Sequence, residues 1–359
     1  MGYTRLVGLR YGVRGLLGAD YRDLTGLAPA QLDLLARTPS SALGACRLKL
    51  DDAQTAAAFA ALQALEAGAF LYIGGNDSAD TAHRLAGMAA RAGDPLRVLA
   101  VPKTMDNDLP ATDHCPGYGS VARYVAIATL ETTLDTRAMP ETYPVKILEV
   151  SGRYAGWIAA AGALARTVDP TTPHMIYVPE RPLILDRFIA DVRGVLAREG
   201  HCIVVISENL TGPDGKRLDT GPARFVDSFG HAYYPSPADM LCQELRRVGI
   251  RARFDKPGTL QRMSQALASD VDREEAWRCG AAAVRAAAAG HTDAMIALDR
   301  VAVDPYHCET TLVPLAEIAN TERLLPAEFL DPAGNNITDA FIAYALPLIG
   351  GPLPAYFQF

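Results

Sequence analysis

Short apolar runs alternate along the chain with longer segments in which apolar residues recur every three or four positions. The short runs predict buried strands, and the longer segments predict amphipathic helices that cross between parallel strands. Strands are expected at 69–73, 97–101, 145–150, 175–178, 202–206 and 294–298. Each run ends beside polar residues or glycine, where α/β sheets usually carry their chemistry. The pattern therefore predicts the α/β class.

Helices are expected at 54–66, 118–134, 237–248 and 273–289. A further helix follows the first predicted strand, because apolar residues recur there at helical spacing, and Ser78 is the predicted N-cap. The alanine-rich stretch near 281–289 is interpreted as helix, since alanine has the highest helix propensity.

Length and composition add the expectation of two lobes. At 359 residues the chain exceeds the roughly 250–300 residues at which one hydrophobic core stops growing. With 49% hydrophobic and 21% charged residues, the composition is that of a globular protein. No repeat or linker is visible in the sequence, so any boundary between lobes must be set by the fold.

The formal net charge of -7 makes nucleic acid a poor candidate partner, because nothing draws in a phosphodiester backbone over long range. The six cysteines show no CxxC spacing and predict reduced thiols. The N-terminus lacks a signal-peptide core, and no apolar run reaches the roughly 18 residues of a membrane helix. We therefore expect a cytoplasmic protein with no membrane attachment.

Two polar segments follow successive predicted strands. In LYIGGNDSADTA, a Gly-Gly turn precedes a helix, so its backbone N–H groups can bind an anion with help from the helix dipole. In VPKTMDNDLP, Asp106 and Asp108 can supply one carboxylate as a general base and another to steer a metal ion. Taken singly, each segment is equally consistent with an ordinary turn.

Together with the following TDHCPGYGSVARY, these segments resemble the phosphofructokinase family, whose GGDGS or GGDDS loop holds the donor phosphates and whose P(G/K)TIDND loop carries the catalytic aspartate. The similarity continues in EVSGRYAGWIA (149–159), VVISEN (204–209) and RFDKPGTLQR (253–262), and it covers nearly the whole chain in the family's order. It implies a two-lobed fold with doubly wound, mainly parallel sheets. A donor-phosphate lobe is expected at 1–117 and 260–325, a fructose 6-phosphate lobe at 118–259 and a C-terminal segment at 326–359.

The resemblance also implies roles for individual residues. Asp106 would be the base that deprotonates the attacking sugar hydroxyl, in a catalytic set with Lys103 and Thr104. The implied sugar-phosphate ligands are Thr104, Asp106, Asp108, Ser151, Gly152, Arg153, Glu208, Arg253 and Arg262. The implied donor ligands are Arg47, Gly74, Gly75, Asp77, Ser78 and Lys103, and Mg²⁺ would bind at Asn76 and Asp77.

Asp77 and Lys103 decide the expected donor. Family members that use ATP resemble GGDGS and PGTIDND, whereas pyrophosphate users carry an acidic residue and a lysine at these two positions. A carboxylate at Asp77 would crowd and repel the inner phosphate of a nucleotide, by about 4 kcal/mol at 4 Å and an effective dielectric near 20. We therefore expect reversible transfer from pyrophosphate to fructose 6-phosphate.

Several positions depart from the family pattern. Its first βα unit, with a GGDxPGxN loop, is not found, so we expect either a start upstream of Met1, which we favour, or a partial paralogue with exposed strand edges. Asn76, Ser151 and Thr259 replace a usual Asp, Met and His. Pro144 stands where an arginine is usually lent across the subunit interface, and Lys146 is a candidate substitute.

Three hypotheses stay open from the sequence. The first is a pyrophosphate-dependent phosphotransferase that acts as a homodimer or homotetramer. The second is a non-catalytic sugar-phosphate sensor that lost donor binding, and the third is an ATP-dependent phosphofructokinase.

Overall fold

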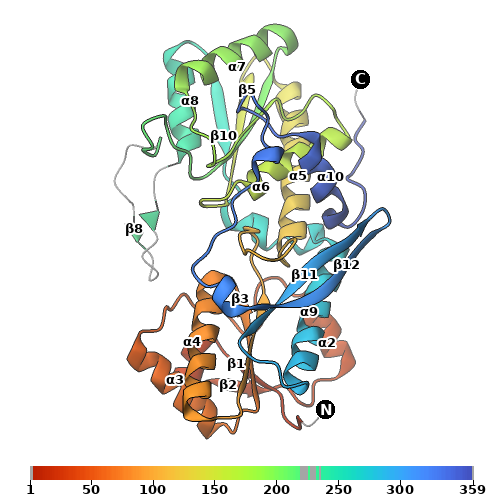
Figure 1. The fold of residues 1–359 in the computed structure, drawn as a ribbon. Coiled ribbons are helices and arrows are strands. Elements are labelled where there is room, and N and C mark those ends of the chain that lie inside the picture. Colours follow the sequence, from red (N-terminus) through yellow and green to blue (C-terminus); the bar gives the residue numbers. More distant parts are fainter. Residues whose placement is uncertain (1–2, 219–224, 227–231, 234–235, 358–359) are drawn as a thin grey trace.

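The computed structural model describes residues 3–218, 225–226, 232–233 and 236–357, and it has two lobes stacked one above the other (Figure 1). The lower lobe contains a sheet in the order β12-β11-β4-β3, formed by β3 (Ala69–Gly74), β4 (Arg97–Pro102), β11 (Ala294–Val303) and β12 (Tyr306–Pro314). The upper lobe contains a parallel sheet in the order β10-β5-β7-β6, formed by β5 (Val145–Val150), β6 (Met175–Tyr177), β7 (Cys202–Ser207) and β10 (Ala252–Asp255).

Helices cover both faces of each sheet (Figure 1). The α-helices are α1 (Val13–Leu17), α2 (Pro29–Arg37), α3 (Asp52–Ala64), α4 (Asn76–Ala92), α5 (Tyr118–Ala138), α6 (Trp157–Ala160), α7 (Leu185–Glu199), α8 (Pro237–Arg247), α9 (Asp270–Ala288) and α10 (Asp339–Ala345). Two short antiparallel pairs complete the strands, β1 (Val7–Leu9) with β2 (Tyr21–Asp23) and β8 (Phe225–Val226) with β9 (Ala232–Tyr233).

The lower sheet is buried on both faces because successive side chains of a strand point in opposite directions. In β4, Val98 and Ala100 pack into the cluster that includes α3 and α4, whereas Leu99 and Val101 pack with α9 on the other face. This arrangement explains why the strand reads as a continuous apolar run and not as an alternating one.

The upper sheet is built in the same way. In β5, Val145 and Ile147 belong to the cluster with α7 and α8, while Leu148 and Val150 face α5 and α6. The chain's last helices join this second cluster, where the Trp157 ring lies 5.9 Å from Phe329, centroid to centroid. The C-terminal segment is therefore part of the upper core.

The structure confirms the α/β class and all six predicted strands. Five of them agree within one residue at each end, while β11 continues five residues further into a hairpin with the unpredicted antiparallel strand β12. The prediction that Ser78 caps its helix was wrong: α4 begins at Asn76 after the N-cap Gly75, so Ser78 lies within the first turn. The short strand β10 and helix α7 were also missed.

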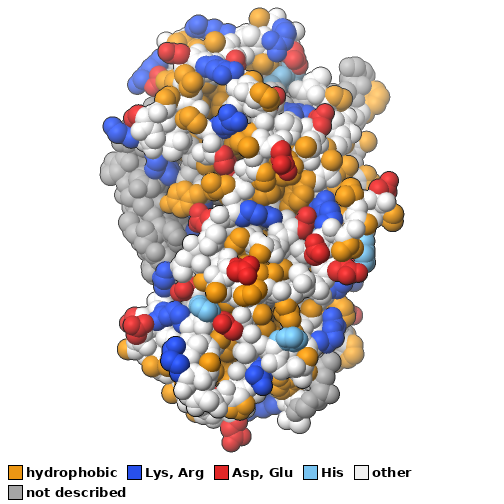
Figure 2. All heavy atoms as spheres, viewed as in Figure 1, with side chains coloured by type: hydrophobic (Ala, Val, Ile, Leu, Met, Phe, Trp, Pro, Cys, Tyr) orange, Lys and Arg blue, Asp and Glu red, His pale blue; other side chains and the backbone are white. Residues whose placement is uncertain are grey.

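Within the described residues, β3 has a hydrogen-bonded neighbour only on its β4 side. Ile73 on this edge strand is 64% exposed, whereas most residues of the neighbouring strand β4 are buried. Figure 2 shows acidic and basic side chains mixed over the visible face, without a field of one sign. None of the helices in the part of the chain that the structure describes is long and apolar enough to cross a membrane.

Candidate active site

The loop that follows β4, residues 103–113, is called here the aspartate loop. It begins beside the end of β3, because the Lys103 amide donates to the Gly74 carbonyl at 3.0 Å. Thr104 then forms a parallel bridge with Gly117, just before α5, and its Oγ1 accepts the Asp106 amide at 3.1 Å. These bonds hold the loop at the carboxyl end of the lower sheet.

Asp106 and Asp108 occupy an unusual electrostatic setting. Burial raises the pKa of Asp106 to about 7, and the neighbouring charges of Asp108 and Glu208 add to this rise, while Arg153 and Lys103 oppose it. Burial also raises the pKa of Asp108. One oxygen of each aspartate is buried without a hydrogen-bond partner in the structure. A carboxylate with a pKa near neutrality and a free oxygen can accept a proton.

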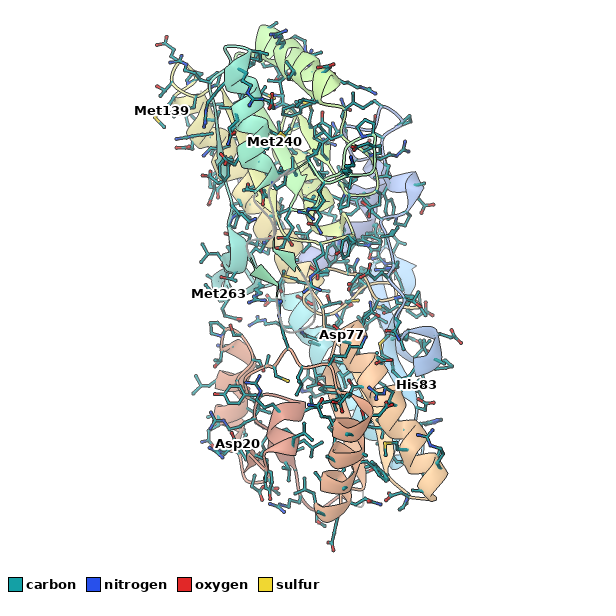
Figure 3. The ribbon with its side chains drawn as sticks, turned by 90° about the vertical axis from the view of Figure 1, so that its left-hand side faces the viewer. Asp20, Asp77, His83, Met139, Met240 and Met263 are labelled. Carbon is teal, nitrogen blue, oxygen red and sulfur yellow. The ribbon has the colours of Figure 1, made fainter. Side chains whose placement is uncertain are left out.

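The GGND turn lies beside this loop. A Cβ placed on Gly75 would be 3.8 Å from the Thr104 Cβ, so the two segments are in contact. Asp77 lies in the first turn of α4, and Figure 3 shows it at the end of the lower lobe that faces the upper lobe, whereas His83 lies further down the helix. The N-terminus of α4 is thus directed toward the aspartate loop, which is the arrangement that binds phosphate in other α/β proteins.

The upper sheet contributes the segment after β5. Gly152 has φ 138°, and a Cβ there would lie 2.8 Å from the Ala155 carbonyl, so only glycine fits this turn. The next residue, Arg153, has φ 43°, and its positive charge partly offsets the rise in the pKa of Asp106 and Asp108. The Glu208 amide, at the end of β7, donates to the Val150 carbonyl at 2.9 Å. The carboxyl ends of both sheets therefore meet at Asp106.

Basic side chains complete this region. Lys103 is exposed, but partial desolvation of its ammonium group lowers its pKa; the positive charges of Arg262 and Arg47 act in the same direction, while Asp106 and Asp108 raise it. The charge of Lys103 therefore interacts with those of Asp106 and Asp108 and with those of Arg47 and Arg262. Because arginines stay charged at any working pH, this group can bind a multiply charged phosphate.

Arg253, a predicted sugar-phosphate ligand, lies apart from the aspartate loop of its own chain. Arg253 lies on β10 in register with Lys146 of β5. Lys146 is five residues before Ser151, so this level of the sheet is about 16 Å along the strand from Ser151. The Arg253 guanidinium donates to Asp135 and lies 5.5 Å from the Tyr143 ring centroid. Lys146 is also ion-paired, with Asp255. Neither side chain points to the aspartate loop of its own chain.

A magnesium ion fits the residues present only in part. Among the described residues, no three His, Cys, Asp or Glu side chains are arranged as a metal site. However, the Asn76 Oδ1 is buried without a hydrogen-bond partner, as are the Oδ1 atoms of Asp106 and Asp108. Mg²⁺ commonly takes one or two protein oxygens and fills its remaining positions with water and substrate phosphates. These orphaned oxygens are consistent with that mode of binding.

Comparison with known proteins places this geometry in a family. The phosphofructokinase family model matches residues 1–287. The chain belongs to the phosphofructokinase family. It is 39% identical over 358 residues to the pyrophosphate--fructose 6-phosphate 1-phosphotransferase of Xanthomonas campestris, covering 98% of this chain and 85% of that one. The corresponding enzyme of Rhodospirillum rubrum is 39% identical over 354 residues, covering 97% and 86%.

A crystal structure of the pyrophosphate-dependent phosphofructokinase from Marinobacter aquaeolei superimposes with a TM-score of 0.86 at 35% identity, over 99% of this chain and 85% of that one. The two-lobed arrangement is therefore that of a phosphofructokinase.

Two polar side chains near the phosphofructokinase site were not predicted. Gln261 donates from Nε2 to the Ser151 Oγ at 2.8 Å, and its Oε1 is buried without a partner. Ser207 at the end of β7 also has a buried, unpartnered Oγ, which lies 3.8 Å from a Cβ placed on Gly152. Gln261 lies within RFDKPGTLQR and Ser207 within VVISEN, so the position of each in a segment that resembles the family was the available signal.

Proposed function

We propose that this chain transfers a phosphoryl group reversibly from pyrophosphate to the 1-hydroxyl of fructose 6-phosphate. The P–O–P bond of pyrophosphate breaks as the sugar oxygen bonds to phosphorus, and the products are orthophosphate and fructose 1,6-bisphosphate. Asp106 takes the hydroxyl proton. The observation that carries the proposal is the half-buried Asp106 carboxylate, whose Oδ1 is buried without a hydrogen-bond partner where the carboxyl ends of both sheets meet; its raised pKa, about 7, agrees with a general base.

The proposed donor site lies between the start of α4 and Lys103. The Gly74–Gly75 turn and Ser78 would bind pyrophosphate oxygens through backbone and hydroxyl donors, while Lys103 and Arg47 supply positive charge. Asp77 in the first turn of α4 would exclude the inner phosphates of a nucleotide. A compact diphosphate matches this charge arrangement better than ATP.

The proposed metal ligands are Asn76 and Asp77, with Mg²⁺ offsetting the charge of the donor phosphates when it is bound. Asn76 Oδ1 is buried and unpartnered, which supports its part in this site. The chain's own residues would orient the donor against Lys103 and keep Asp106 within reach of the sugar.

The proposed sugar-phosphate site uses Thr104, Asp108, Gly152, Arg153 and Glu208. Arg262 would bind the 6-phosphate, and Ser151 would be held by Gln261. Since Arg253 points away from the site of its own chain, we propose a homodimer or homotetramer in which the partner's Arg253 approaches the 6-phosphate.

The decisive experiment follows fructose 1,6-bisphosphate formation by the purified chain from fructose 6-phosphate and Mg²⁺, with pyrophosphate or ATP offered in parallel. Turnover with pyrophosphate alone is the expected result. Turnover with ATP alone would overturn the donor assignment. A folded chain that binds fructose 6-phosphate, ignores pyrophosphate and turns over neither donor would be a sensor and not an enzyme.

The rate should depend on pH through Asp106. In the forward direction Asp106 must be ionised to accept the proton, so kcat/KM for fructose 6-phosphate should fall about tenfold per pH unit below about 7 and level off above it. In the reverse direction Asp106 must be protonated, so that rate should fall as the pH rises above about 7. Initial rates in both directions between about pH 5.5 and 9 check this, and parallel profiles in the two directions would contradict the assignment.

Reversibility gives a separate expected result. The phosphoanhydride spent and the ester formed differ less in free energy than they do when ATP is the donor. The chain should therefore break down fructose 1,6-bisphosphate when orthophosphate is supplied, releasing pyrophosphate. An enzymatic assay for pyrophosphate measures this release, and the same reaction without orthophosphate is the control. If adding orthophosphate produces no pyrophosphate, the reaction is not reversible.

A further inference from the structure

Arg323 donates more hydrogen bonds to the aspartate loop than any residue predicted for the site. Its Nε and Nη2 donate to the Asn107 carbonyl at 3.3 and 2.9 Å, and its Nη1 donates to the carbonyls of Thr112 and Asp113 at 2.6 and 2.7 Å. Its backbone amide donates to the Asp108 carbonyl at 2.7 Å. One side chain thus joins the two ends of the segment that carries Asp108.

The other side of Arg323 is held by the upper lobe. Its guanidinium lies 4.5 Å from the Trp157 ring centroid, and the Trp157 Nε1 donates to the Arg323 carbonyl at 3.1 Å. Two residues later, the Leu325 amide donates to Glu180 Oε1 at 2.8 Å. The same oxygen accepts the amide of Gly156, at the start of α6, also at 2.8 Å. The segment around Arg323 therefore links the aspartate loop to the segment that follows β5.

The carbonyl that Arg323 binds belongs to a residue with an uncommon backbone conformation. Asn107, between the two aspartates, is fully buried and has φ 58°, a left-handed conformation that asparagine tolerates better than most non-glycine residues. Its side chain points inward, where Oδ1 accepts the Cys115 amide at 2.9 Å and Nδ2 donates to the Tyr344 hydroxyl at 3.1 Å. Arg323 fixes the carbonyl of this residue, and thereby the directions in which its two neighbours project.

We propose that Arg323 is a positioning residue for the phosphoryl transfer: by binding the carbonyls of Asn107, Thr112 and Asp113 it holds Asp106 and Asp108 in their productive orientation. Its guanidinium donors are directed to backbone carbonyls, so it positions the two aspartates through the backbone, and its charge also acts on Asp108. The proposal rests on the proposed function, because it concerns the carboxylates that would carry that reaction. Orientation matters at such a site, since a misplacement of about 1 Å can cost about 100-fold in rate.

Arg166 offers a matched control. It also donates to backbone carbonyls of distant segments, to Ile337 at 3.1 Å and to Pro173 at 3.2 Å, and it binds the Asn336 side chain. It anchors the C-terminal segment to the upper core as Arg323 does, but none of these bonds reaches the aspartate loop. A purely structural role of Arg323 would make the two arginines equivalent.

The kinetic test compares R323M, R323K and R166M. R323M is expected to lose about 100-fold in kcat while KM for fructose 6-phosphate and pyrophosphate changes less than about threefold. R323K should lose less, because an ammonium group can still bind part of the carbonyl set. R166M should lower the melting temperature without this kcat loss. Equal effects of R323M and R166M on kcat, or a loss confined to KM, would overturn the proposal.

A second readout does not depend on turnover. The Cys115 thiol is fully buried next to the loop, and burial raises its pKa to about 12, so it should react slowly with iodoacetamide. Loosening the loop should raise its labelling rate, mapped by peptide mass spectrometry, at least about tenfold in R323M and R323K but not in R166M. Buried Cys202 in β7 is the internal reference.

These readouts separate the two hypotheses. A wild-type chain that does not use pyrophosphate would overturn the proposed function, and Cys115 labelling would still decide whether Arg323 holds the loop. If R323M does not fold, R323K decides through the same two measurements. Unchanged Cys115 labelling in a folded Arg323 variant would overturn the positioning role even if the wild type is active.

Discussion

Replacing Asp106 with Asn is expected to lower kcat for fructose 6-phosphate phosphorylation by about 10²- to 10⁴-fold, the usual contribution of a general base. Asparagine has the same shape but cannot take the proton of the sugar hydroxyl. The bond from the residue 106 amide to the Thr104 Oγ1 involves only backbone on the side of residue 106, so the loop should be retained. The measurement is steady-state kinetics at saturating pyrophosphate and Mg²⁺.

The same substitution has an expected sign for stability. Burial and the charges of Asp108 and Glu208 raise the pKa of Asp106 above its usual value, so the ionised carboxylate destabilises the fold as the pH rises through about 7. The neutral amide removes this cost, and the melting temperature of D106N at pH 8 should equal or exceed that of the wild type. D186N, at an exposed position in the first turn of α7, is the control. Retention of more than about a tenth of the wild-type kcat by D106N would exclude Asp106 as the base.

Replacing both Asp77 and Lys103 with glycine is expected to reduce pyrophosphate-dependent turnover by about 10- to 100-fold, because a hydrogen bond to a charged group contributes about 1.5–3 kcal/mol. Lys103 is exposed, and its charge interacts with those of Asp106 and Asp108. Loss of Asp77 removes a repulsion of up to about 4 kcal/mol against a nucleotide phosphate. The ratio of ATP-dependent to pyrophosphate-dependent kcat/KM should therefore rise.

The two single variants identify the source of each effect. Lys103→Gly should weaken pyrophosphate use without improving ATP use, whereas Asp77→Gly should mainly increase tolerance of ATP. Parallel kinetics with both donors, at fixed fructose 6-phosphate and Mg²⁺, measure this. If the double variant uses both donors as the wild type does, Asp77 and Lys103 do not select the donor, and the ATP-dependent hypothesis gains support.

The central strands were predictable because each is buried on both faces. Val145–Val150 appears at the predicted residues, since a strand packed between α5 and α6 on one side and α7 and α8 on the other must be apolar throughout. The hairpin partner β12 was missed because only some of its residues are buried, and its polar positions interrupt the apolar run. Ser78 was taken as the N-cap because its residue type is typical of that position, but the preceding glycines set the start of α4 earlier.

The residues that bind directly in the proposed site could be proposed from sequence because they lie in contiguous motifs at strand ends. The residues that hold those motifs in place could not. Arg323 lies more than 200 residues after the aspartate loop, in a segment with no recognisable motif, and its bonds are to backbone carbonyls that have no sequence signature. Glu180 similarly binds two amides from distant segments.

The sequence by itself therefore determined the α/β class, the positions of six strands, the resemblance to phosphofructokinases and the chemical types available at the strand ends, because hydrophobic period and local motifs are properties of neighbouring residues. Only the tertiary structure decided that Asp106 is partly desolvated beside the negative charges of Asp108 and Glu208, which together raise its pKa. It also decided that Arg253 lies away from its own chain's site and that Arg323 donates hydrogen bonds to the backbone of the aspartate loop. Burial, charge proximity and contacts across hundreds of residues arise only when the two sheets are brought end to end.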